Sequence, residues 1–160
     1  MPDQYSQSEE EARAEFLTTF CDVAAFQGRV AYCLMSVYAV NPYVFEYFTD
    51  INFYPYFFWN MVYGITFMIV SRPSMRPLMP IHRATFSLLG SLSFNYSSLM
   101  WYDWLNVHLG ERTILRTLAA YFSGRVFMVH LIAFMYHVDT RCTAVDQRPR
   151  RESVFEAMYL

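Results

Sequence analysis

Two long stretches without a charged side chain constrain this protein more than any other feature of its sequence. Residues 53–70 and 84–102 contain no Asp, Glu, Lys or Arg. As helices with a rise of about 1.5 Å per residue, they match the roughly 30 Å hydrocarbon core of a membrane. The whole chain is 55% apolar and only 16% charged, whereas soluble domains carry about 25% charged residues. These features indicate a membrane protein and argue against a soluble globule.

The sequence predicts an all-α fold, a small integral membrane bundle with three transmembrane helices. We expect the spans at residues 53–71, 84–104 and 113–138. The loop 72–83 between the first two contains three prolines, which prevent it from forming one continuous helix.

The apolar segment 16–40 predicts one more helix, which has a polar face. Asp22, Arg29 and Ser36 recur every seven residues, so they share one side of a helix. Such a helix is either amphipathic and interfacial, or a fourth span whose polar face is buried against protein. The chain then divides into a polar N-terminal segment (1–15), a membrane domain (16–138) and a polar, arginine-rich tail (139–160).

The arginines predict the orientation of the bundle. The loop 72–83 has three arginines and the tail has four, whereas the connector 41–52 has none and the turn 105–112 has one. Two crossings separate the loop from the tail, so both lie on one side. The positive-inside rule places that side inward.

One face of the second span is polar and small. Ser87, Ser91, Asn95 and Ser98 follow one another at intervals of four, four and three residues. Small polar side chains at this spacing favour close contact with another helix in a membrane. We therefore expect this face to be buried in the bundle.

The third span carries an intramembrane arginine and two histidines. Arg125 needs a partner in a membrane, because an arginine at the bilayer centre costs about 2.5–3.5 kcal/mol on insertion scales. Asp22 is the expected ion-pair partner of Arg125, with Asp103 as an alternative. A second interpretation is that Arg125 contacts a quinone, a lipid phosphate or an ion path. Four polar residues recur every seven positions on another face: Arg116, Ser123, His130 and His137.

The two histidines on that face allow two interpretations. Each could form a hydrogen bond to a neighbouring helix. Alternatively, a histidine that faces the interior of a helical bundle can ligate haem iron, with the second ligand from another helix.

Two short motifs resemble the large cytochrome b anchor of succinate dehydrogenase. Residues 76–85 read RPLMPIHRAT and residues 134–137 read FMYH, similar to the family's Arg-Pro-Leu, His-Arg-x-Thr and Tyr-His segments. The resemblance implies that Arg83 and the adjacent His82 face ubiquinone and that His137 ligates haem b. The chain departs from the family at Met79, where a serine is usual, and at Phe86, where a glycine is usual.

The resemblance also implies a location and partners. We expect a non-catalytic subunit of a mitochondrial respiratory-chain complex in the inner membrane, with the loop 72–83 and the tail on the matrix side. Its partners would be other membrane subunits and lipids. The alternatives are a supernumerary structural subunit of ATP synthase or of complex I, III or IV, and a small transporter or channel lined by Arg125, His130 and His137.

Other classes of function find no support in the residues. The chain contains no GxSxG, HExxH, P-loop or dinucleotide-binding motif. The three cysteines, Cys21, Cys33 and Cys142, have no metal-ligand spacing. The net charge of −2 argues against nucleic-acid binding.

Overall fold

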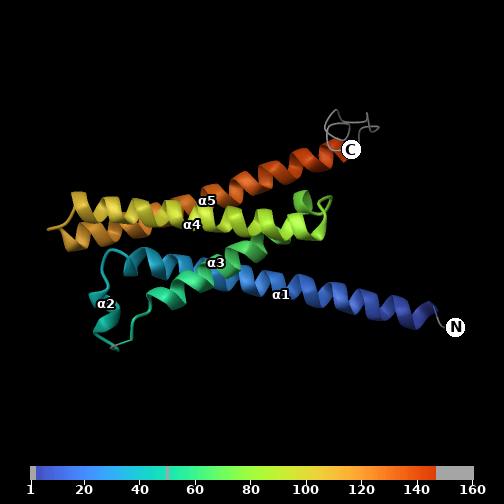
Figure 1. Ribbon diagram of the computed structural model, residues 1–160, viewed down its shortest axis with the longest axis horizontal. Coiled ribbons are helices and arrows are strands. Elements are labelled where there is room, and N and C mark those ends of the chain that lie inside the picture. Colours follow the sequence, from blue (N-terminus) through green and yellow to red (C-terminus); the bar gives the residue numbers. More distant parts are fainter. Residues whose placement is uncertain (1–2, 50, 147–160) are drawn as a thin grey trace.

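A computed structural model describes residues 3–49 and 51–146, which form an all-helical structure without strands (Figure 1). The chain order is α1 (Asp3–Tyr38), α2 (Tyr43–Glu46), α3 (Tyr54–Val70), the 3-10 helix η1 (Pro73–Met75), α4 (Pro80–His108) and α5 (Thr113–Asp146). The all-α expectation is confirmed in these residues. Within them, one helical segment, Thr113–Cys142, is long and apolar enough to cross a membrane by length and composition.

Proline sets several of the helix boundaries. Pro55 lies in the first turn of α3, and Pro80 is the first residue of α4; at these positions the missing N–H costs nothing, because the first N–H groups of a helix have no partner within it. Pro73 follows the end of α3 closely, and the chain passes through η1 before α4 begins.

Three helices extend beyond the ranges that the sequence predicts. α1 runs without a break from Asp3, so residues 3–15 continue the helix expected at 16–40. α4 begins at Pro80, which places His82 and Arg83 in its first turn rather than in a loop. α5 continues to Asp146, so the beginning of the expected tail is helical. The remaining tail arginines, Arg148, Arg150 and Arg151, lie outside the described residues.

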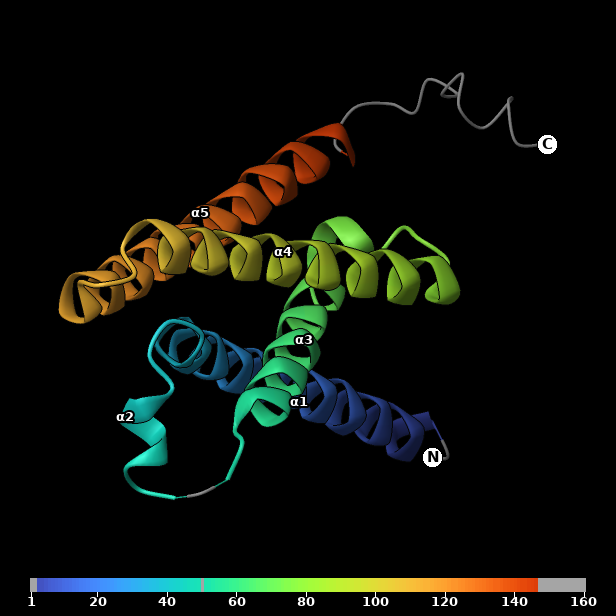
Figure 2. The same ribbon diagram turned by 60° about the vertical axis from the view of Figure 1, so that its left-hand side comes forward.

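The centre of the fold is the crossing of α1 and α3 (Figure 2). The two helices touch at Gly28 and Gly64, where a Cβ added to Gly64 would lie 2.3 Å from the Cα of Gly28. Small residues permit this approach of two backbones, as they do at many membrane helix contacts. α3 is therefore held between α1 on one side and α4 on the other.

The helices α4 and α5 complete the bundle. They run side by side near the turn that joins them and diverge toward the other end, where α5 contacts η1 (Figure 1). The buried core includes Tyr32, Met35 and Tyr38 from α1 and Met61, Ile65 and Met68 from α3, joined by Leu99, Tyr102 and Leu105 from α4 and by Ala120, Met128 and Met135 from α5.

The predicted polar face of α4 is buried, as expected. Ser87, Ser91 and Asn95 are fully inaccessible to solvent and Ser98 is nearly so. Ser91 donates a hydrogen bond to the carbonyl oxygen of Val62 on α3 at 2.8 Å, and Tyr32 on α1 donates one to Ser98 at 2.7 Å. These bonds link three helices through the interior, which confirms that the small polar residues mediate helix contact.

Large apolar side chains cover much of the outside. On α1 these include Phe16, Phe20, Val23, Phe26 and Val30, and on α5 they include Ile114, Phe122, Val126, Val129 and Phe134. Only 22% of the most apolar part of α5 is buried inside the molecule. An apolar surface of this extent is larger than soluble monomers usually expose, and such surfaces are typical of contact with a membrane or with another protein.

Candidate functional site

A pocket of about 460 Å³ lies where α1, the end of α3, the loop around η1 and the start of α4 meet. Four arginines line it: Arg29, Arg72, Arg76 and Arg83. Asp22 lies on the same wall, two turns before Arg29 on α1. The pocket also has apolar lining residues, among them Leu17, Met68 and Ile132.

Arg29 and Arg83 are held at the pocket by backbone carbonyl groups. The Nε atom of Arg83 donates to the carbonyl oxygen of Val70 at 2.7 Å, and its Nη2 atom donates to the same oxygen. Val70 is the last residue of α3, and the last carbonyls of a helix lack partners within it. Arg29 donates from Nε to the carbonyl oxygen of Ala25 at 3.3 Å. These bonds use only part of each guanidinium, which has five N–H donors.

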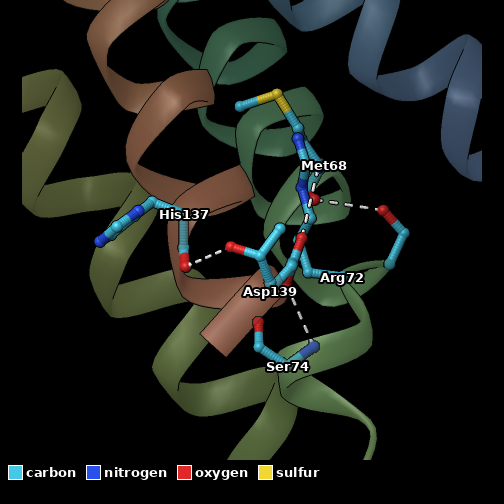
Figure 3. Close-up of polar contacts among 7 residues, drawn as sticks. Met68, Arg72, Ser74, His137 and Asp139 are labelled. Carbon is cyan, nitrogen blue, oxygen red and sulfur yellow. Dashed lines mark hydrogen bonds and ion pairs between the residues drawn. The ribbon is translucent and has the colours of Figure 1, made fainter. Parts of the chain in front are cut away.

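Arg72 is held by the end of α5 (Figure 3). Its Nη1 atom lies 3.5 Å from a carboxylate oxygen of Asp139, and the backbone N–H of Ser74 donates to the other oxygen at 3.2 Å. Asp139 is buried. One carboxylate thus joins the loop to α5 and keeps Arg72 beside the pocket.

The net charge of the pocket is positive. Asp22 lines the pocket, and Asp139, which does not line it, forms an ion pair with Arg72. The four arginines therefore retain two positive charges beyond what these two carboxylates neutralise. Guanidinium groups match the geometry of phosphate and carboxylate oxygens, so the pocket is suited to an anionic group.

The sequence singles out only part of this site. Arg83 was expected to face ubiquinone, and it lines the pocket. The adjacent His82 is exposed and stacks on Phe86 instead, with ring centroids 6.1 Å apart. Arg29, Arg72, Arg76 and Asp139 were not recognised as parts of one site. Two features of the sequence could have indicated this site, namely the seven-residue spacing of Asp22 and Arg29 and the three arginines of the loop 72–83.

The two histidines of α5 lie elsewhere. His130 and His137 are both exposed. His130 lines a separate apolar pocket of about 370 Å³ between α4 and α5. Figure 3 shows the His137 ring directed away from Arg72 and Asp139. Neither histidine faces the interior of this bundle, so a haem that they ligate would lie between this chain and a neighbour.

The ring nitrogen atoms of His130 are compatible with ligation of haem iron. Its Nδ1 atom lies 2.8 Å from the carbonyl oxygen of Val126. With the proton on Nδ1, this bond would leave Nε2 as a lone-pair donor, the arrangement common for metal-ligating histidines.

The structure does not bring Arg125 and Asp22 together. The Nη1 atom of Arg125 lies 3.9 Å from Cys33 Sγ, and Cys33 is eleven residues beyond Asp22 on α1, which corresponds to about 16 Å along a helix. Asp103, the alternative, is exposed on α4 beside a different pocket. The expected ion pair fails because the sequence does not determine how far α5 is displaced along α1.

Comparison of the chain with known protein families, characterised proteins and solved structures gives no match.

Proposed function

We propose that this protein is a non-catalytic subunit of a larger membrane complex. In this proposal α3, α4 and α5 span the membrane, and α1 packs against them as a fourth span. The observation that carries the proposal is the inverted distribution of side chains. Ser87, Ser91 and Asn95 are fully buried, while Phe86 and Leu89 on the same helix are 50% and 59% exposed.

This distribution fits a membrane better than water. Exposed apolar side chains lose nothing in lipid, whereas hydrogen-bonded polar side chains are stabilised when they face other helices. The polar face of α1 follows the same rule in its second half, since Ser36 is buried and Arg29 is half-buried at the arginine pocket, whereas Asp22 lines the pocket but is exposed. This favours the interpretation of α1 as a span packed on protein over that of an interfacial helix.

Arg125 supports the existence of partner subunits. It is exposed in the most apolar part of α5, and among the described residues its recorded polar contact is the thiol of Cys33. An arginine in this position is costly in lipid. A carboxylate or a carbonyl group of a neighbouring subunit would remove that cost.

The resemblance to the succinate dehydrogenase anchor suggests a specific complex. Under this proposal the protein belongs to the mitochondrial inner membrane, and the loop 72–83 faces the matrix. Arg83 in the first turn of α4 would face a quinone, and His137 near the end of α5 would ligate haem b beside a partner chain. The contacts of Arg72 and Ser74 with Asp139 support this, because they bring the two resembling motifs to the same end of the bundle.

Native mass spectrometry of the tagged full-length chain from its own membranes tests the subunit proposal. We expect the chain to resist extraction by alkaline carbonate and to be isolated with stoichiometric partner proteins. Arg125→Leu should lower the fraction in the complex, whereas Arg112→Leu, outside the apolar segment, should not. A stable monomer in mild detergent would contradict the proposal.

The spectrum of the same complex tests the anchor assignment. A b-type absorption band should be present and should be lost or shifted in His137→Ala, with His108→Ala at the other end of α4 as the control. A band unchanged in His137→Ala, or a complex made of ATP synthase subunits, would remove this assignment while leaving the subunit proposal intact.

A further inference from the structure

The arginine pocket contains more fixed positive charge than the fold requires. Asp139 binds Arg72, and Arg83 caps α3, so these two arginines have structural roles. In the part of the chain that the structure describes, the hydrogen bond of Arg29 is to a carbonyl of its own helix, and Arg76 is exposed and makes no ion pair. Their charges therefore remain available to a ligand.

We infer that this pocket binds the headgroup of an anionic phospholipid, with a headgroup of two phosphodiesters preferred over one. The inference rests on the proposed insertion of the chain in a membrane. Two unneutralised positive charges match two phosphodiester groups, each of which carries one negative charge. Basic pockets between membrane helices at the inner surface are suited to such headgroups.

The apolar surroundings favour a lipid over free phosphate. Leu17, Met68 and Ile132 line the pocket together with the arginines. Beside them the outer face of α1 continues with exposed Phe16 and Phe20, and Phe20 packs on Phe67 of α3 with ring centroids 5.4 Å apart. Acyl chains need such a surface next to the headgroup site, whereas inorganic phosphate gains nothing from it.

The position of the pocket in the bundle is also suitable for a lipid headgroup. It lies at the end of α3 and the start of α4, which is the loop end of the bundle (Figure 1). In the proposed topology this end lies at the inward membrane surface, where headgroups are located. The two available arginines, Arg29 on α1 and Arg76 in the loop, would then be joined by one lipid.

Native mass spectrometry of the delipidated full-length chain in detergent measures this binding directly. The probes are cardiolipin, phosphatidylglycerol and phosphatidylcholine, which have two, one and no net negative charges. We expect affinity to decrease in that order. Arg76→Gln should weaken cardiolipin binding about fivefold, and the double variant Arg29→Gln, Arg76→Gln about thirtyfold, from the usual contribution of one arginine near a lipid surface.

Arg141→Gln is the matched control. Arg141 is exposed near the end of α5 and does not line the pocket, so its loss should change cardiolipin affinity by less than about twofold. Within residues 3–49 and 51–146, Arg76→Gln removes no side-chain hydrogen bond or ion pair. Circular dichroism checks that each variant is folded.

Three results would overturn the inference. The double variant could bind cardiolipin like the wild type, Arg141→Gln could weaken binding equally, or inorganic phosphate at comparable concentration could displace cardiolipin. The last result would assign the pocket to a free anion. These results leave the proposed function intact, because that proposal fails instead if alkaline carbonate extracts the chain from membranes.

Discussion

At the residue scale, two glycines determine how closely α1 and α3 approach. A Cβ on Gly28 would lie 2.5 Å from the Cα of Gly64, and a Cβ on Gly64 would lie 2.5 Å from the carbonyl oxygen of Ala24. Real Cβ atoms do not approach backbone this closely, so any side chain at either position forces the helices apart. The neighbouring core then loses contacts that depend on this crossing.

We expect Gly64→Ala to lower the free energy of unfolding by about 1–3 kcal/mol, the usual cost of overpacking. The measurement is thermal or denaturant unfolding in detergent, followed by circular dichroism. Gly90→Ala is the control. A Cβ at Gly90 meets only the end of the Ile69 side chain at 3.4 Å, and alanine favours a helix by about 0.8–1 kcal/mol over glycine.

The control should therefore be neutral or stabilising. Equal effects of the two substitutions would contradict the close crossing of α1 and α3, because both positions lie within helices and differ mainly in what the added methyl group meets.

At the element scale, a substitution on α5 can test whether the outer face of this helix contacts lipid or water. Its segment Thr113–Cys142 is apolar and long enough to cross a membrane by length and composition, and most of its most apolar part is not buried inside the molecule. A charged residue on this face would be harmless in water and costly in lipid. The two environments thus predict opposite results for the same substitution.

We expect Val129→Arg to reduce the fraction of chain that is inserted in the membrane. Val129 is 59% exposed near the middle of α5, where an arginine costs about 2.5–3.5 kcal/mol on insertion scales. Alkaline carbonate extraction of membranes measures the inserted fraction. Val107→Arg, at a 79% exposed position near the end of α4, should be tolerated because its side chain reaches the interface.

An inserted fraction that is equal for wild type, Val129→Arg and Val107→Arg would indicate that this face of α5 does not meet lipid. This face of α5 would then contact water or a partner protein.

At the scale of the whole molecule, the proposed topology places the two ends of α4 on opposite sides of the membrane. The residue before α4, Met79, and the turn residue Glu111 are both exposed. Either can be replaced by cysteine after Cys21, Cys33 and Cys142 have been changed to serine.

We expect a membrane-impermeant maleimide to label Met79→Cys only from the inward side and Glu111→Cys only from the outward side. The reason is the arginine distribution, which favours the loop 72–83 inside. Labelling is measured in intact and in opened mitoplasts or vesicles. Labelling of both positions from the same side would show that α4 does not cross the membrane.

Much of the local structure follows from the sequence alone. Pro55 agrees with the predicted start of α3, because proline is favourable in the first turn of a helix. α4 begins at Pro80, four residues before the span expected at 84–104, because a proline-rich segment can be either a loop or the first turn of a helix. The interval of four, four and three residues from Ser87 to Ser98 correctly predicts a buried face, since helical periodicity determines which side chains share a side. The continuous α1 was not expected, because a charged first segment can be either helix or surface coil.

The tertiary structure alone decided which faces meet. The periodicity of α1 places Asp22 and Arg29 on one face, but only the crossing at Gly28 and Gly64 brings that face to Arg72, Arg76 and Arg83. Likewise, the displacement of α5 along α1 sets Arg125 beside Cys33 rather than Asp22. Helical periodicity is a property of neighbouring residues, whereas the rotation and displacement of packed helices depend on how side chains from distant segments fit together.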